Sequence, residues 1–174
     1  MDLEDYVARV CTQENGAAAF EALKAQAVAA RTYVLWAIRD EAPMGTPEKP
    51  IPNSQSFQTY AAVATPACTA ATAQTRGLVL RFGGALVVAS YVAGARLDDA
   101  GGVSSDPTRT EKWVTYNRGR AGPQVVKTPL LDTSRADNRG CMSQNGADWM
   151  ARRGHDFVTI LRFYYGDDVW LTQG

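Results

Sequence analysis

The chain has 174 residues, with 18 basic and 18 acidic side chains, so its formal net charge is zero. This balance argues against a nucleic-acid-binding protein, which carries a basic excess or a basic stripe. The hydrophobic content of 45% is ordinary for a globular protein, and no run approaches the roughly 18 apolar residues of a membrane-spanning helix. The length suits one domain over residues 1–174, either as one body or as two lobes beside one cleft.

Two helices are predicted at the start of the chain. Apolar residues at helical spacing indicate a first helix over 3–10, and Asn15-Gly16 marks a turn after it. A second helix is expected over 17–42, because this stretch is rich in alanine, the strongest helix former. Its predicted buried stripe consists of Phe20, Leu23, Ala27, Ala30 and Val34. Pro43 ends the helix and begins a proline-rich loop.

The middle of the chain alternates polar and apolar elements. Residues 54–60 predict a short strand with polar side chains on one face. Thr65 and Pro66 form a helix start, with threonine as the N-cap and proline at the first helical position. Two apolar, β-rich runs follow on either side of Gly83-Gly84, a pair that favours a tight hairpin turn.

The last third begins with a loop-rich segment over 93–132, in which 113–116 and 124–126 are expected to form short strands. Two amphipathic helices are then predicted, over 145–154 and over 157–165. The fold class is therefore α+β, with the alanine-rich helix in the centre and further helices and small antiparallel sheets around an open groove.

Several blocks of the sequence, in this order, resemble the SpoIID/LytB family, whose members act on bacterial peptidoglycan. The strongest block is the helix signature over 21–33. The others are the opening segment over 6–14, the polar segment over 56–60, the glycine hairpin over 77–89, and three C-terminal blocks over 142–147, 151–154 and 160–166. Together they extend over nearly the whole chain.

The resemblance implies lytic transglycosylation of glycan strands stripped of their stem peptides, with Glu14 as the catalytic acid. Such an enzyme cleaves after N-acetylmuramic acid and closes a 1,6-anhydro ring with the sugar's own hydroxyl, so no water is activated. One carboxyl therefore suffices, whereas most glycosidases need two. The chemistry requires no cofactor. The acid must be protonated near neutral pH, a form that burial favours.

The residues alone leave another reading of Glu14 open, as a solvated side chain near the positive end of a helix. After Glu14 the chain also departs from the family pattern, because Asn15-Gly16 and three alanines replace the usual Met-Pro and Trp. Glu21 is the competing carboxyl and is interpreted as a structural residue of the first helical turn.

The resemblance also indicates residues that contact the substrate: Lys24, Gln26, Arg31, Ser56, Gln58, Ser143 and Gln144. Each has a structural alternative. Lys24 and Arg31 lie seven residues apart on one helix face, where ion pairs are equally expected, and Ser143 is suited to cap a helix. Four aromatic residues are candidates for stacking on sugar rings, although each could equally belong to the core: Tyr91, Trp113, Tyr116 and Trp149.

The cysteines leave two readings open. Cys11, Cys68 and Cys141 are odd in number, so at most one internal disulfide can form. They are either buried thiols or include a Cys11–Cys141 bridge, since both flank the family motifs. With His155 as the sole histidine, no metal site is expected.

Two further functions stay open at this stage. The first is a non-catalytic glycan-binding module that stimulates a cell-wall amidase. The second is a cytoplasmic interaction domain, because residues 1–5 show neither the basic nor the apolar region of a signal peptide. The resemblance favours an exported domain of the periplasm or cell wall whose signal or anchor has been trimmed away.

Overall fold

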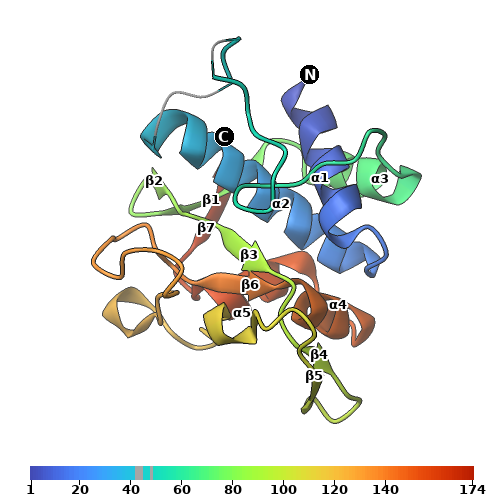
Figure 1. Ribbon diagram of the computed structural model, residues 1–174. Helices are drawn as coiled ribbons and strands as arrows, with labels where there is room; N and C mark the ends of the chain where they lie inside the picture. Colours follow the sequence, from blue (N-terminus) through green and yellow to red (C-terminus); the bar gives the residue numbers. More distant parts are fainter. Residues whose placement is uncertain (42–44, 48) are drawn as a thin grey trace.

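The computed structural model describes residues 1–41, 45–47 and 49–174 (Figure 1). Its α-helices are α1 (Leu3–Asn15), α2 (Phe20–Trp36), α3 (Pro66–Gln74), α4 (Gln144–Arg152) and α5 (Phe157–Tyr165), and a π-helical turn, η1 (Ala37–Glu41), extends α2. Small sheets accompany them, so the predicted α+β class is confirmed. None of the helices in these ranges is both long enough and apolar enough to cross a membrane.

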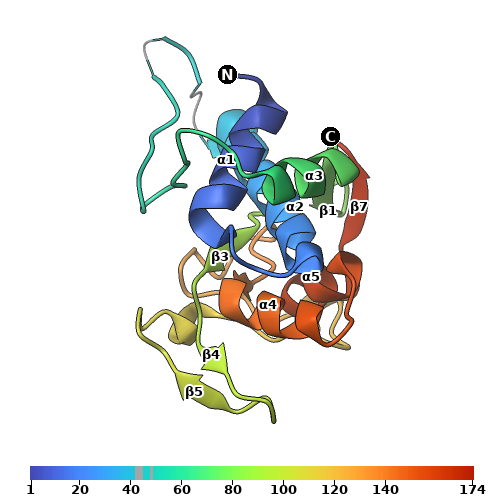
Figure 2. The same ribbon diagram turned by 90° about the vertical axis from the view of Figure 1, so that its right-hand side faces the viewer.

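The strands form three small sheets. In the first, β1 (Leu78–Phe82) lies between β2 (Ala85–Leu86) and β7 (Trp170–Gln173), and both pairings are antiparallel. The second pairs β3 (Ser90–Val92) with β6 (Cys141–Ser143) in parallel, and the third pairs β4 (Arg96–Leu97) with β5 (Val103–Ser105) antiparallel. The β4–β5 hairpin projects away from the helices in both views (Figures 1 and 2).

The predicted glycine hairpin is confirmed between β1 and β2. Gly83 and Gly84 have φ angles of 56° and 84°, so both turn positions use the left-handed region that glycine enters without strain. The hairpin places β3 next along the chain, beneath α2 in the view of Figure 1.

Helix α2 is buried on nearly all sides, which the sequence analysis did not predict. Ala22, Ala25 and Val28 face a core shared with α4 and α5, whereas Ala27 and Ala30 pack against Tyr6, Val7 and Val10 of α1. Phe20, which was predicted to be buried, is 37% exposed. The prediction of one stripe was wrong because alanine side chains are small enough for other elements to approach from several directions.

Four other segments differ from their predicted structure. Helix α1 continues beyond its predicted end at Val10 to Asn15, where the predicted Asn15-Gly16 turn follows, and Gly16 caps it with φ −59°. Residues 54–60 form no strand; only an isolated bridge joins Asn53 to Gln58. The two short strands expected over 113–116 and 124–126 do not form. The 3₁₀ turns η2 (Glu111–Trp113) and η3 (Gly122–Gln124) reach only the first residue of each stretch, and the other residues are irregular. The end predicted for the second helix, residues 42–43, lies outside the described residues.

The helix caps follow their sequence signals. Thr65 accepts a hydrogen bond from the Cys68 amide at the start of α3. Asp156 accepts one from the Thr159 amide, at 2.7 Å, at the start of α5. Gly166 ends α5 with φ 102°. These signals are local, which is why sequence alone located both helices.

The three cysteines are free and buried, so the proposed Cys11–Cys141 bridge is wrong. Cys11 of α1 shares a small core cluster with Cys68 of α3, Leu23 and Ala71. The two thiols interact, and hydrogen bonds from Cys11, Thr65 and Thr12 lower the pKa of Cys68.

Candidate active site

A cavity of about 720 Å³ lies between two parts of the chain. The first part, here called the N-terminal wall, comprises Gln13, Glu14, Tyr33, Gln55, Ser56, Phe57 and Thr59. The second, the C-terminal wall, comprises residues 90–93, Thr108, Thr110, Trp113, Leu130, Leu131 and Gln144. Hydroxyl, amide and aromatic groups dominate both walls, a lining that suits an uncharged polar ligand such as a sugar.

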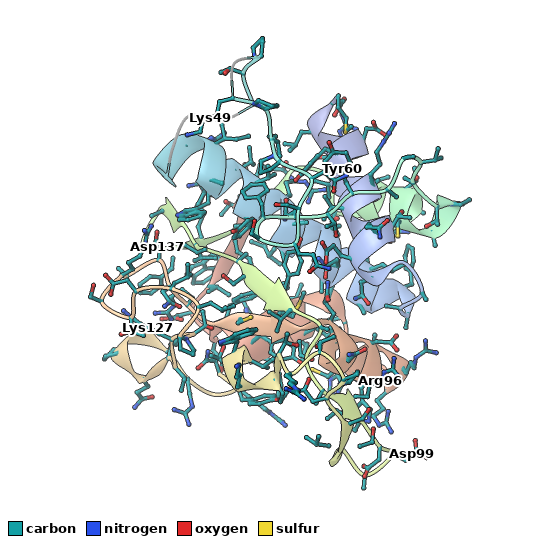
Figure 3. The ribbon with its side chains drawn as sticks, in the orientation of Figure 1. Lys49, Tyr60, Arg96, Asp99, Lys127 and Asp137 are labelled. Carbon is teal, nitrogen blue, oxygen red and sulfur yellow. The ribbon has the colours of Figure 1, made fainter. Side chains whose placement is uncertain are left out.

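Glu14 is the sole charged side chain among the described residues that line the cavity. Figure 3 shows the labelled charged residues Arg96, Asp99, Lys127 and Asp137 toward the edges of the molecule. Since ordinary glycosidases use two carboxyl groups, the lining described here matches chemistry that needs only one.

Helix α1 and the segment after Asn53 position Glu14 together. The residue lies in the last turn of α1 and is half-buried. Thr59 donates two hydrogen bonds to its Oε1 atom, one from the backbone amide at 2.8 Å and one from the hydroxyl. Oε2 receives no hydrogen bond from the described residues, so one oxygen is anchored and the other is available to a ligand.

Gln58, next to Thr59, joins both walls from beneath the cavity. Its side chain is 1% exposed. The amide nitrogen donates to the Ala30 carbonyl at 3.2 Å and to the Tyr91 hydroxyl at 2.9 Å. The amide oxygen accepts from the Tyr6 hydroxyl at 2.8 Å. This buried amide therefore links α1, α2 and β3 in one fully hydrogen-bonded unit.

Two residues predicted to bind substrate are held in ion pairs and do not line the cavity. Arg31 is fully buried and pairs with Glu4. Lys24 pairs with Glu21 and lies 5.0 Å from the ring centre of Phe157. These contacts favour the structural alternative for both residues, which is a role in ion pairs.

Glu21 also has a structural partner. Its Oε2 accepts a hydrogen bond from the Phe157 amide, at 2.8 Å, at the start of α5. The carboxylate therefore joins the first turn of α2 to α5, and it does not line the cavity.

Of the C-terminal pair Ser143 and Gln144, only Gln144 lines the cavity. Ser143 is 2% exposed and caps α4, accepting from the Gly146 amide at 2.9 Å. Gln144 contacts the fully buried Gln26, with 3.4 Å between Nε2 and Oε1. Ser56 lines the opposite wall. The structure thus brings Glu14, Ser56 and Gln144 to one cavity, with Gln58, Ser143 and Gln26 behind its surface.

The aromatic candidates separate in the same way. Tyr91 and Trp113 line the cavity. Trp149 donates its indole N–H to the Asp98 carbonyl at 2.7 Å, and Arg153 stacks on its ring. Tyr116 bonds to Glu111. The last two therefore serve the fold of the loop-rich segment.

Sequence reasoning missed Thr59, although it belongs to a quoted block, because its role depends on contact with a residue 45 positions earlier. It also missed Tyr33 and Phe57, whose rings contact each other in the N-terminal wall with ring centres 5.2 Å apart and planes tilted by 54°. Thr108, Thr110, Leu130 and Leu131 carry no sequence signal, since they come from irregular loops.

A comparison with protein families matches residues 1–82 to the SpoIID family, described as stage II sporulation protein. This part of the chain is similar to the SpoIID family. The matched SpoIID region contains α1, α2, α3 and β1, and with them the whole N-terminal wall. The C-terminal wall lies beyond the match. A search of curated proteins found none that matches the chain.

Proposed function

We propose that this protein, whose residues 1–82 are similar to the SpoIID family, is a lytic transglycosylase that cleaves peptidoglycan glycan strands after N-acetylmuramic acid, with Glu14 as general acid and base. The observation that carries the proposal is the placement of Glu14. It is the one carboxyl in the lining described above, with Oε1 held by Thr59 and with no hydrogen bond to Oε2 from the described residues.

One carboxyl can perform both proton transfers. Glu14 first donates its proton to the glycosidic oxygen while the bond from that oxygen to C1 of the muramoyl residue breaks. The resulting carboxylate then accepts the proton of the C6 hydroxyl while O6 bonds to C1 and closes the 1,6-anhydro ring. Atoms balance without water, and the enzyme returns to its initial state.

The cavity supports a carbohydrate substrate. Tyr33, Phe57 and Trp113 line the cavity with aromatic rings, whereas Ser56, Thr110 and Gln144 offer hydroxyl and amide groups for sugar hydroxyls. The lining contains no basic side chain among the described residues. This composition favours strands from which the anionic stem peptides have been removed.

The proposed substrate also assigns a location and partners. Peptidoglycan lies outside the cytoplasmic membrane, so the protein acts in the periplasm or cell wall. An amidase that removes stem peptides would supply its substrate.

The test is product analysis on amidase-stripped glycan strands. Wild-type protein is expected to generate new 1,6-anhydromuramoyl ends, detected by mass spectrometry as products one water lighter than those of hydrolysis. Glu14→Gln is expected to abolish them, because the amide cannot donate and reclaim the proton. Glu21→Gln is the matched control, since it makes the same chemical change on a carboxylate outside the cavity and is expected to retain activity.

Two outcomes would contradict the proposal. Glycan binding without new anhydro ends, by both the wild type and Glu14→Gln, would indicate the non-catalytic module that stimulates an amidase. A protein with no affinity for glycan would exclude both functions.

A further inference from the structure

Tyr91 lies in the C-terminal wall, on strand β3, and its hydroxyl has a defined hydrogen-bonding direction. The Gln58 amide nitrogen donates to the Ala30 carbonyl, which can only accept, at 3.2 Å. This contact fixes which end of the Gln58 side chain is the nitrogen. The same nitrogen lies 2.9 Å from the Tyr91 hydroxyl oxygen, so Tyr91 accepts in this bond.

An accepting hydroxyl still has its own hydrogen to donate. Among the described residues no acceptor receives a hydrogen bond from Tyr91. The residue lines the cavity and is half-buried, and the Glu14 carboxyl is one of its charged neighbours. The hydroxyl hydrogen is therefore directed into the cavity, beside the proposed acid.

Tyr6 makes an instructive comparison. Its hydroxyl also bonds to the Gln58 amide, but it donates to the amide oxygen at 2.8 Å. Its hydrogen is thus used inside the protein, and Tyr6 is 4% exposed and does not line the cavity. Both phenols therefore bond to the Gln58 amide, Tyr6 as a donor and Tyr91 as an acceptor. Only Tyr91 keeps its hydroxyl hydrogen for a ligand.

We propose that the Tyr91 hydroxyl is a second catalytic group, which donates a hydrogen bond to an oxygen of the sugar residue that Glu14 protonates. The inference rests on the proposed glycan-cleaving function. Burial and the nearby Glu14 raise the pKa of Tyr91 well above its ordinary value, so the phenol stays neutral at every working pH. It therefore acts as a donor that keeps its proton, and Glu14 remains the group that transfers one.

Gln58 gains a role from this arrangement. By occupying a lone pair of the Tyr91 oxygen, it leaves the hydroxyl hydrogen with few orientations other than the cavity. Gln58 is thus a positioning residue, which acts on the substrate through Tyr91.

The experiment compares Tyr91→Phe with Tyr6→Phe in the anhydro-end assay, together with wild type and Glu14→Gln. Each phenylalanine removes one hydroxyl bonded to Gln58, so each is expected to lower the urea unfolding midpoint, and Tyr6→Phe by more, because it leaves the buried Gln58 amide oxygen without its donor. Tyr91→Phe is expected to reduce kcat/KM about tenfold, the effect of losing one hydrogen bond to a neutral acceptor. Tyr6→Phe is expected to stay within about twofold of wild type.

Equal activity of the two phenylalanine variants would overturn the inference, because the Tyr91 hydroxyl would then matter only through Gln58. A wild type that behaves like Glu14→Gln, with no anhydro ends, would overturn the proposed function and this inference with it. The two failures are distinguishable, since the first requires an active wild type.

Discussion

The buried ion pair between Arg31 and Glu4 gives a sharp test of what α2 contributes to stability. Arg31 Nε lies 3.0 Å from Glu4 Oε1, and Nη2 lies 2.6 Å from Oε2. A third donor, Nη1, bonds to the Leu78 carbonyl at 3.0 Å. The Arg31 side chain is 0% exposed and that of Glu4 is 17% exposed. The guanidinium charge is therefore compensated almost entirely by one carboxylate.

The perturbation is Glu4→Gln, which keeps the shape of the side chain and removes its charge. One of the two charge-assisted hydrogen bonds is replaced by an amide NH₂ that faces the guanidinium. Breaking a buried pair costs about 3–5 kcal/mol, because the remaining charge is left unpaired. The partial exposure of Glu4 places the expected loss near the lower end, at about 3 kcal/mol. With a urea m-value of about 2 kcal/mol per molar, the unfolding midpoint falls by about 1.5 M.

The matched control is Asp5→Asn, one residue along α1. Asp5 pairs with Arg9 at 3.0 Å, but the two side chains are 44% and 28% exposed. Such an exposed pair contributes about 0.2–1 kcal/mol. If Glu4→Gln lowers stability by no more than Asp5→Asn does, the reasoning from burial is refuted. Glycan affinity is expected to survive in folded Glu4→Gln, and its loss would return Arg31 to the substrate-binding residues.

Two further predictions concern the loop next to the cavity and the acid stability of α5. Gly94 has φ +69°, and a Cβ there would lie 2.1 Å from Ser143 Oγ; Gly94→Ala is expected to lower the free energy of unfolding by about 3 kcal/mol. The control is Gly119→Ala: Gly119 has φ +73°, but nothing lies within 4 Å of a Cβ there, so this variant should lower the free energy of unfolding by only about 1 kcal/mol. If thermal or urea unfolding shows equal losses for both variants, the clash of a residue-94 Cβ with Ser143 is contradicted. Hydrogen bonds from Thr159 lower the pKa of Asp156, so its carboxylate stabilises the fold above the unfolded pKa of about 3.9, and this contribution is lost as pH falls through the lower folded value. Urea unfolding at neutral and acid pH should therefore show that the stability difference between wild type and Asp156→Asn shrinks in acid. A difference that grows in acid would contradict the predicted direction of this pH dependence.

Local signals in the sequence predicted the elements whose ends are capped by neighbouring residues. The starts of α3 and α5 follow from Thr65-Pro66 and Asp156, and the β1–β2 turn follows from Gly83-Gly84. Each of these signals acts over at most four residues, so it can be recognised in the sequence without knowledge of the tertiary structure.

What the sequence did not predict depends on contacts between distant residues. The parallel pairing of β3 with β6 joins Tyr91 to Met142, about fifty positions apart. Likewise, Glu14 was identified by family resemblance, but its anchor Thr59 and its position inside α1 follow from packing of the 54–60 segment on that helix. The ion pair of Arg31 was equally hidden, since Glu4 lies 27 residues away.

Only one of the two walls of the cavity lies in the region that matches the family. Glu14 and its anchor Thr59 belong to the matched region, whereas Tyr91, Trp113 and Gln144 come from the remainder of the chain. Under the proposed function, the acid is therefore encoded in the matched stretch, whereas the side chains proposed to contact sugar come from both stretches of the chain. The same proposal implies that substitutions of Trp113 or Gln144 would change which glycan is accepted and leave Glu14 and Thr59 in place, so the cavity is divided along the sequence although it is continuous in space.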